Sequence, residues 1–243
     1  MTATPLSCFE RIYVINLKSR ADRRVEMAEQ LERVGLGLAS PQVQLFEAVR
    51  PDSPGAFPSI GTRGCFMSHL QVLRDARDRG LASVLILEDD LNFVKDFGTR
   101  FEPVRRCLQQ QPWGMFYGSY TFYGEAPTLP DAPCVQADAQ LPISTTAFVA
   151  VHGAWIGRLI KYLEAMLQRP AGDPAGGPMH VDGAYCWFRA AYPEMACWLA
   201  HPSLGYQRSS QTDIHPPRWF DRVQPVAAVV SILRKLRNRL RRL

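Results

Sequence analysis

The stretch Val-Leu-Ile-Leu-Glu-Asp-Asp at residues 84–90 constrains the fold more than any other part of the chain. Four consecutive apolar residues, two of them β-branched, are typical of a strand buried on both faces in the middle of a parallel sheet. The strand ends in three carboxylates, Glu88, Asp89 and Asp90. Because ligands bind at the carboxyl ends of strands in open α/β sheets, this run predicts a site at that edge.

The three carboxylates have two interpretations. Adjacent like charges raise the cost of ionisation unless a cation or hydrogen-bond donors neutralise them. Oxygen ligands suit a hard divalent ion such as Mg²⁺ or Mn²⁺, with substrate phosphates completing the shell. The alternative is a solvated strand end at which Glu88 or Asp89 starts a turn. The stretch by itself leaves both open.

The elements expected along the chain predict an α/β fold. Strands are expected at 11–17, 43–49 and 84–87, with a helix between each pair, and this βαβαβ order favours a parallel sheet with right-handed crossovers. The first helix is expected to bury Val25, Ala28, Leu31 and Val34 and to end at Gly35. The second is expected to open at Thr62–Leu70. Further helices are expected at 95–110, 154–167 and 183–190, strands at 113–118 and 145–151, and irregular chain at 119–142.

Cysteine usage and hydropathy indicate the compartment. The six cysteines of the 243-residue chain form no C-x-x-C pair and no zinc-like spacing. Without a signal peptide at the N-terminus, they are expected to be reduced thiols in a cytoplasmic protein. No apolar run approaches the roughly 20 residues needed to span a bilayer. We therefore expect no membrane-crossing segment.

The net charge of +5 is concentrated at the C-terminus. Residues 234–243 hold six of the 28 basic residues and no acidic one, so the other 233 residues carry 22 basic and 23 acidic side chains. A whole-surface nucleic-acid footprint is thus not supported. Residues 226–243 predict an amphipathic helix about 27 Å long, with a Val/Leu stripe opposite the basic residues. Such a helix either lies in the interface of an anionic bilayer or packs on its own domain.

Several polar residues are candidates for binding or catalysis. The basic turn 18–24 after the first strand could hold a nucleotide through bidentate arginine contacts, or could be a solvated helical turn. His69 is favoured as a structural side chain. Asp182 could be a catalytic carboxylate, although an N-cap for residues 183–190 is the simpler interpretation. His215 is a possible late ligand. Tyr120, Phe122 and Tyr123 could stack on a sugar ring or pack against the sheet.

Three motifs in fixed order resemble glycosyltransferase family 25. They are IYVINLKSRADRR, GTRGCFMSHLQVLRDA and VLILEDDLNF, which together cover roughly residues 10–95. Weaker similarities follow in HVDGAY and SSQTDI. The resemblance implies a GT-A-like domain over 1–225, with a mixed, mainly parallel sheet flanked by helices, followed by the basic helix at 226–243. It also implies a nucleotide-sugar donor, usually UDP-galactose, and inversion at the anomeric carbon.

The resemblance also implies residue roles. Asp90 would bind Mn²⁺ or Mg²⁺ and Glu88 would assist, while Glu88 and Asp89 would also contact the donor. Asn16, Arg20 and Arg24 would lie on the nucleotide side. An inverting transfer needs one base for the acceptor hydroxyl. Asp182 is the first choice for this base. The rivals are Asp138, Asp173 and Asp213.

These features predict a metal-dependent hexosyltransferase that acts on a glycolipid or lipooligosaccharide acceptor. With the basic tail on the anionic inner leaflet, the enzyme would be cytoplasmic and peripheral on the inner face of the inner membrane. One alternative is a non-catalytic relative that docks other envelope-assembly proteins. A nucleotidyltransferase or hydrolase is less favoured, because the chain has no P-loop and no Gly-rich phosphate signature.

Overall fold

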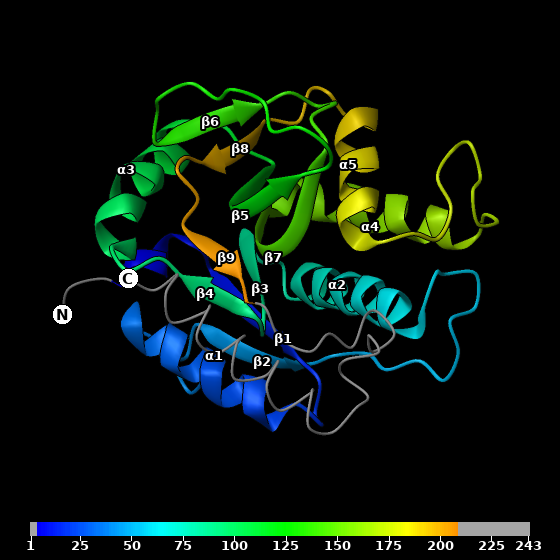
Figure 1. The fold of residues 1–243 in the computed structure, drawn as a ribbon, viewed down its shortest axis with the longest axis horizontal. Helices are drawn as coiled ribbons and strands as arrows, with labels where there is room; N and C mark the ends of the chain where they lie inside the picture. Colours follow the sequence, from blue (N-terminus) through cyan, green and yellow to red (C-terminus); the bar gives the residue numbers. More distant parts are fainter. Residues whose placement is uncertain (1–3, 209–243) are drawn as a thin grey trace.

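The computed structural model describes residues 4–208, and Figure 1 shows their arrangement. The apolar run forms β3 (Ser83–Glu88), which pairs in parallel with β1 (Arg11–Asn16), and β1 pairs in parallel with β2 (Val43–Glu47). The βαβαβ order expected from the sequence is therefore confirmed. The C-terminal helix expected at 226–243 lies outside the described residues, as do Asp213 and His215.

The remaining elements complete an α/β fold. They are η1 (Pro5–Cys8), α1 (Ala21–Arg33), α2 (Ile60–Asp78), β4 (Leu91–Phe93), α3 (Phe97–Gln110), β5 (Met115–Phe122), β6 (Cys134–Ala137), β7 (Ile143–His152), α4 (Gly153–Leu167), α5 (Val181–Ala191), β8 (Cys197–Ala200) and β9 (Gly205–Gln207). No helix among residues 4–208 is long and apolar enough to span a membrane.

The central sheet has seven strands in the order β2-β1-β3-β7-β5-β8-β6. Strands β7 and β6 pair antiparallel with their neighbours, while β1–β2, β1–β3 and β5–β8 are parallel pairs. Five of the seven strands therefore run in one direction, and the expected mixed, mainly parallel sheet is confirmed.

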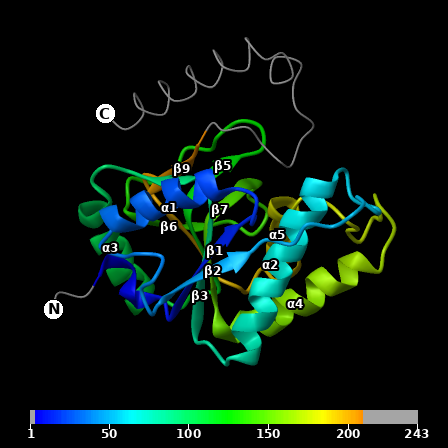
Figure 2. The same cartoon turned by 90° about the horizontal axis from the view of Figure 1, so that it is seen from below.

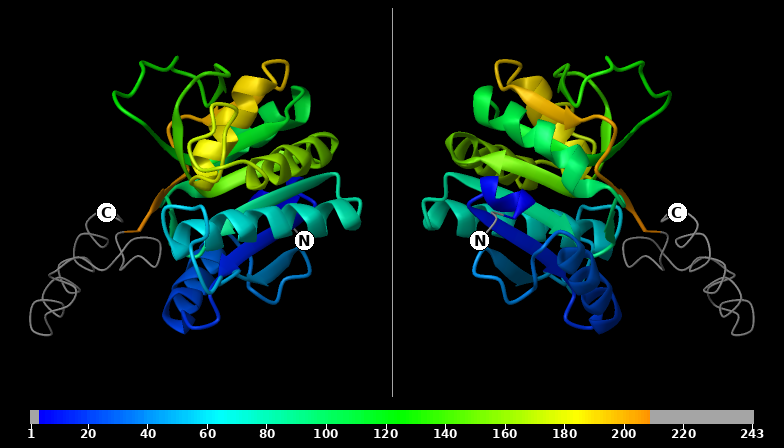
Figure 3. Two further views of the ribbon diagram at one scale, coloured as in Figure 1. Left: turned by 90° about the vertical axis from the view of Figure 1, so that its right-hand side faces the viewer. Right: turned by 90° about the vertical axis from the view of Figure 1, so that its left-hand side faces the viewer.

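Helices cover both faces of this sheet. Figure 2 shows α1 and α3 on one side and α2, α4 and α5 on the other, and α2 and α4 lie side by side in Figure 3. In β3, Val84 and Ile86 pack into the core under α2, α4 and α5, whereas Leu85 and Leu87 pack into the core under α1 and α3. Because alternate side chains point to opposite faces, a strand between two cores must be apolar throughout.

A small second sheet brings the end of the described chain to the carboxylates. Strand β9 pairs antiparallel with β4, with Leu91 opposite Gln207. The backbone N–H of Arg208 donates to the carbonyl of Asp90 at 2.7 Å. Residues more than 110 positions apart in sequence therefore share one edge of the main sheet.

Some local expectations were wrong. Helix α2 begins at Ile60 because Ser59 caps it, with the Thr62 N–H donating to the Ser59 hydroxyl at 3.0 Å. The segment 119–142 contains the end of β5 and all of β6, and β8 and β9 were not expected. In α1 the buried stripe is Arg23, Met27, Gln30 and Leu31, while Val25 is 62% exposed.

Candidate functional site

Two cavities meet at the carboxyl end of β3. The first, of about 410 Å³, lies between the ends of β1 and β3 and the start of α2. The second, of about 340 Å³, lies between β3, the start of β7 and the start of α5. Four residues line both cavities: Arg23, Cys65, Glu88 and Asp90. Two ligands bound in these cavities would therefore meet over the same charged floor.

Asp90 has one carboxylate oxygen without a hydrogen-bond donor among the described residues. Its Oδ2 accepts from the Gln207 amide at 3.1 Å and lies 3.6 Å from the Arg23 guanidinium. Its Oδ1 is buried and has no hydrogen-bond partner among residues 4–208. Burial, reinforced by the charge of Glu88, raises the pKa of Asp90 to about 7. An orphaned oxygen of this kind calls for a ligand.

Glu88 is held from two sides. The Thr146 hydroxyl of β7 donates to Glu88 Oε1 at 2.6 Å, and His69 Nε2 of α2 lies 3.4 Å from the same oxygen. His69 is fully buried, and its Nδ1 is 3.0 Å from the Tyr185 hydroxyl of α5. Tyr185, His69, Glu88 and Thr146 thus form a chain of polar contacts below the shared floor.

Asp89 faces the protein interior. Its Oδ2 accepts from the Asn16 amide at 2.7 Å, and its Oδ1 from the Arg23 guanidinium at 2.8 Å. Asp89 lines the first cavity, yet both of its oxygens are already engaged. The alternative of a solvated strand end was wrong, because Asp89 and Asp90 are buried.

Asp182 stands on the wall of the second cavity. Helix α5 has His180 at its N-cap, so the N-cap interpretation of Asp182 was wrong. Its Oδ2 accepts from the Ser144 hydroxyl at 3.2 Å and from the Thr145 backbone N–H at 3.1 Å. Thr145 has φ of 70°, a left-handed conformation that is strained for a β-branched residue. Such strain is characteristic of functional sites, because the surroundings must hold it in place.

Tyr123, just beyond β5, lies beside Asp182. The tyrosine is 49% exposed, and partial burial together with the negative charge and hydrogen bond of Asp182 raises the pKa of its phenol to about 12. An exposed aromatic ring next to an anchored carboxylate is a suitable surface for a sugar. Tyr120 and Phe122 instead pack against the core, as the alternative for these rings expected.

Comparison with known proteins identifies the N-terminal part of the chain. Residues 9–112 match the sequence model of Glycosyltransferase family 25 (LPS biosynthesis protein). This part of the chain is similar to glycosyltransferase family 25. The match contains β1, α1, α2 and the acidic end of β3, which together build the first cavity and the shared floor.

Family 25 relatives include both transferases and proteins named inactive. Procollagen galactosyltransferase 1 of Danio rerio is 30% identical over 127 residues, which cover 45% of this chain and 21% of the relative. The inactive glycosyltransferase 25 family member 3 of Homo sapiens is 27% identical with the same coverage. The chain thus spans about a fifth of the length of these curated relatives.

Among solved structures, the crystal structure of a glycosyltransferase involved in the glycosylation of the major capsid of PBCV-1 is similar with a TM-score of 0.44. The sequence identity is 11%, and the alignment covers 83% of this chain and 93% of that one.

The basic turn brings to the cavities a different arginine from those expected from the sequence. Arg20 pairs with Asp22 at 2.9 Å and lowers the pKa of that carboxyl to about 2, and Arg24 donates to the carbonyl of Lys18 at 3.1 Å. Neither of them lines a cavity, nor does Asn16, which supports Asp89. Arg23 lines both. The donor roles of Asn16, Arg20 and Arg24 stay predictions.

The position of Arg23 predicts a large stability effect. Its side chain is 10% exposed and pairs with Asp89, whose side chain is 9% exposed. Replacing Arg23 with leucine leaves a buried carboxylate without its cation, so the free energy of unfolding should fall by about 3 kcal/mol. Arg24→Leu is the matched control, with an expected change within about 0.5 kcal/mol. Urea unfolding of both variants measures this, and equal midpoints would contradict a structural ion pair.

The site residues fit a divalent cation of the hard class. Glu88 and Asp90 project onto one floor, and Asp90 Oδ1 has a free lone pair there. Three carboxylates face two arginines, Arg23 and Arg208, so the floor retains an excess of negative charge. Carboxylate oxygens with room for phosphate oxygens are the ligands that Mg²⁺ and Mn²⁺ favour.

The sequence analysis did not single out Cys65, and it did not predict that His69 would lie beside Glu88. Their spacing of four residues places them on the same face of α2, which is a readable signal. Both lie against Glu88, and Cys65 lines both cavities. Burial and the neighbouring carboxylates raise the pKa of the Cys65 thiol well above its ordinary value. Asp138 and Asp173, the described rivals of Asp182, line neither cavity.

Proposed function

We propose that the protein is an inverting glycosyltransferase that binds a UDP-sugar in the first cavity and an acceptor saccharide in the second. The observation that carries this proposal is the shared floor, because transfer between two substrates requires their reacting atoms to meet. Glu88 and Asp90 line both cavities, and Asp182 lines the second.

The first cavity suits a nucleotide diphosphate. Leu17, Val49, Pro51 and Ile60 give it apolar walls, and Arg23 with the acidic pair lies at its inner end. Apolar walls with a few convergent polar groups are typical of cofactor and nucleotide pockets. A base and ribose would occupy the walls, and the diphosphate would reach the charged floor. A divalent ion held by Asp90 and Glu88 would offset the charge of the departing diphosphate.

The second cavity suits the acceptor. Asp182, fixed by Ser144 and by the strained Thr145, would accept the proton of the acceptor hydroxyl as that oxygen attacks the anomeric carbon. The new glycosidic C–O bond forms while the bond to the diphosphate breaks, and UDP leaves with the electron pair. Attack from the face opposite the leaving group inverts the anomeric carbon.

The names of the relatives support galactose as the sugar and a glycoconjugate as the acceptor. Procollagen galactosyltransferases of several vertebrates match this chain, and the family description refers to LPS biosynthesis. We take the donor to be a UDP-hexose, whose epimers differ by one hydroxyl. Galactose transfer to a lipid-linked or lipooligosaccharide acceptor is our working assignment.

A thermal-shift panel tests the donor site. The protein is melted with UDP, GDP, CMP or ADP, each with Mn²⁺ and with a chelator. We expect UDP with Mn²⁺ to stabilise the fold by about 2.7 kcal/mol at 100 times its Kd, which is several degrees in Tm. A shift that is equal for all four nucleotides, or that persists in chelator, would contradict a metal-dependent UDP site.

The basic C-terminal sequence favours a peripheral position on an anionic membrane, which we propose is the cytoplasmic face of the inner membrane. Each basic residue near such a surface adds about 1 kcal/mol of attraction. Deleting residues 226–243 should therefore release the protein from anionic vesicles while UDP binding stays intact. Co-sedimentation measures this, and equal sedimentation of the full-length and truncated chains would rule out the membrane role.

A non-catalytic function is the second candidate, because several matched relatives are named inactive. Such a protein would keep the fold and bind other components of envelope assembly. It predicts that Asp90→Ala changes neither nucleotide binding nor any transfer of sugar. Loss of a nucleotide shift in that variant would therefore count against it.

A further inference from the structure

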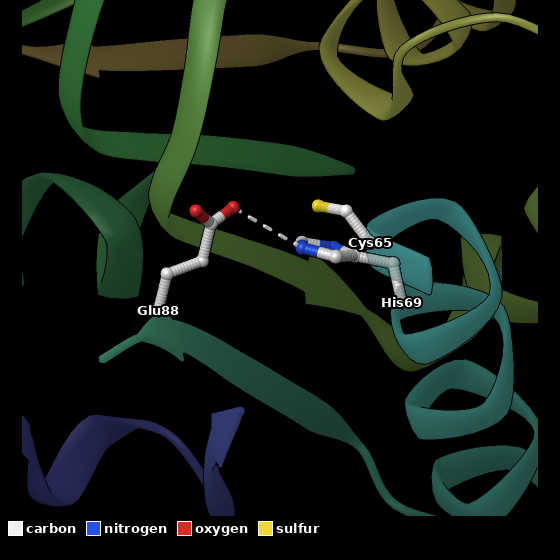
Figure 4. Close-up of side chains that lie close together, drawn as sticks. All are labelled: Cys65, His69 and Glu88. Atoms are coloured by element: carbon white, nitrogen blue, oxygen red, sulfur yellow. Dashed lines mark ion pairs between the residues drawn. The ribbon is translucent and has the colours of Figure 1, made fainter. Parts of the chain in front are cut away.

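We propose that Cys65, His69 and Glu88 form a second cation site, which is selective for a thiophilic ion such as Zn²⁺ and shares Glu88 with the proposed hard-ion site at Asp90. Figure 4 shows Cys65 and His69 projecting from α2 toward Glu88 at the end of β3. Their ligand atoms, one sulfur, one nitrogen and one oxygen, all lie within 4.8 Å of one another. Thiolate, imidazole and carboxylate are the three ligand types that zinc combines.

The geometry is close to that of a bound ion. Ligand atoms about 2.0–2.3 Å from one tetrahedral ion are roughly 3.5 Å apart. His69 Nε2 and Glu88 Oε1 are already 3.4 Å apart. Cys65, four residues before His69 and on the same helical face, needs only a side-chain rotation to complete three ligands. Both cavities reach Cys65 and Glu88, so an ion has an entry path and a water can be the fourth ligand.

An independent observation points to a ligand at this place. His69 Nε2 is buried and has no hydrogen-bond partner among the described residues, although its ring is fully enclosed. The other ring nitrogen, Nδ1, is 3.0 Å from the Tyr185 hydroxyl, which fixes the ring so that Nε2 faces Glu88. Metal-binding histidines are oriented in this way by a partner on the second nitrogen.

The donor set decides the class of ion. A sulfur and a nitrogen ligand favour zinc and similar ions over Mg²⁺, which prefers oxygen ligands only. When the ion binds, the sulfur–ion bond forms as the thiol proton leaves to solvent. Glu88 would then be drawn toward α2, away from the floor that it shares with Asp90. Under the proposed function this would inhibit transfer, but binding itself does not depend on that function.

The test is a Co²⁺ titration of the reduced full-length protein without nucleotide, read by visible absorption. We expect one equivalent to give the intense bands of tetrahedral cobalt with a thiolate charge-transfer band, and Zn²⁺ but not excess Mg²⁺ to remove them. Cys65→Ser should abolish the thiolate band and weaken Zn²⁺ binding by more than the roughly 100-fold that losing an outer-shell partner costs. Cys107→Ser, on α3 across the sheet, is the matched control and should behave as the parent.

His69→Gln is the second variant, since it keeps much of the buried volume and removes the imidazole. It should weaken Zn²⁺ binding to a similar extent. A full thiolate band in Cys65→Ser, or no tetrahedral cobalt spectrum in the parent protein, would overturn the proposal. Neither result would bear on the UDP shift, which is measured separately with Mn²⁺, so failure of this site and failure of the donor site can be told apart.

Discussion

Asp182→Asn is expected to lower sugar transfer by about 10²–10⁴-fold, the usual contribution of a positioned general base. The amide cannot accept the proton of the acceptor hydroxyl. Its one oxygen can still accept from the Thr145 N–H and the Ser144 hydroxyl, so the turn at Thr145 should keep its conformation, while the hydrogen bond from the Gly183 N–H to the second oxygen is lost. We therefore expect a loss of about 1 kcal/mol in the free energy of unfolding and unchanged UDP binding, together with a much lower kcat.

The controls for this variant are the described rival aspartates. Asp138 accepts from the Gln140 N–H and Asp173 from the Ala175 N–H, both in loops away from the cavities. Asp138→Asn and Asp173→Asn should transfer sugar at rates close to the parent. Steady-state kinetics with a UDP-sugar and a saccharide acceptor measure all three variants. A normal kcat in Asp182→Asn, or an equal loss in either control, would reject Asp182 as the base.

Asp90→Asn is expected to abolish the Mn²⁺-dependent UDP shift and at the same time to stabilise the metal-free protein. The pKa of Asp90 is raised from its ordinary 3.8 to about 7, because burial and Glu88 penalise the charged form. Between these pH values the unfolded chain has lost the proton that the folded chain retains. The free energy of unfolding therefore falls as the pH rises through this window, and the full penalty is present above pH 7.

Asparagine carries no charge and escapes this penalty. In chelator, Asp90→Asn should nearly match the parent at pH 4 and exceed it by up to about 4 kcal/mol at pH 8, since each unit of pKa shift corresponds to about 1.4 kcal/mol. Urea unfolding at several pH values measures the difference. Asp131→Asn, at an exposed loop position, is the control and should give parallel curves. A difference in the free energy of unfolding that stays constant across the pH range would contradict a raised pKa for Asp90.

Asp90→Asn is thus expected to raise the stability of the metal-free protein and to remove the stabilisation by UDP with Mn²⁺. Together these two results distinguish a binding residue from a structural one. A purely structural carboxylate would lose stability on replacement, because its hydrogen bond from Gln207 would weaken. If Asp90 is instead a binding residue that destabilises the empty site, replacing it should raise the free energy of unfolding. Such a cost is common where function requires an unsatisfied charge. The variant should thus be more stable without ligand and inactive with it.

The half of the fold that precedes residue 90 was predictable because its signals are long. Strands β1 and β3 are continuous apolar runs, and the helices between them have Gly35 and Gly80 after their ends, both with positive φ. Strands β6, β8 and β9 have three or four residues each, too few for any periodic pattern to emerge. Only their pairing partners, distant in sequence, make them strands.

Site residues were predictable as far as the motif extended. The acidic run located Glu88 and Asp90, but it could not show that Asp89 turns inward to Asn16 and Arg23. In α1 the buried face was expected to begin at Val25, whereas the observed buried face begins at Arg23. A buried face predicted from hydrophobicity alone leaves out arginine. Arg23 is buried because it pairs with Asp89, a contact between residues distant in sequence that no local pattern indicates.

The pairing of β9 with β4 has a consequence for how the molecule is tethered. Arg208, whose N–H donates to the Asp90 carbonyl, joins the shared floor directly to the chain that leads to the basic segment. Seventeen residues lie between Arg208 and residue 226, and a chain of that length reaches at most about 60 Å. If the basic segment rests on a bilayer, the site can lie no farther than that distance from the membrane surface. Only saccharide that projects within this radius of the lipid headgroups can then be extended.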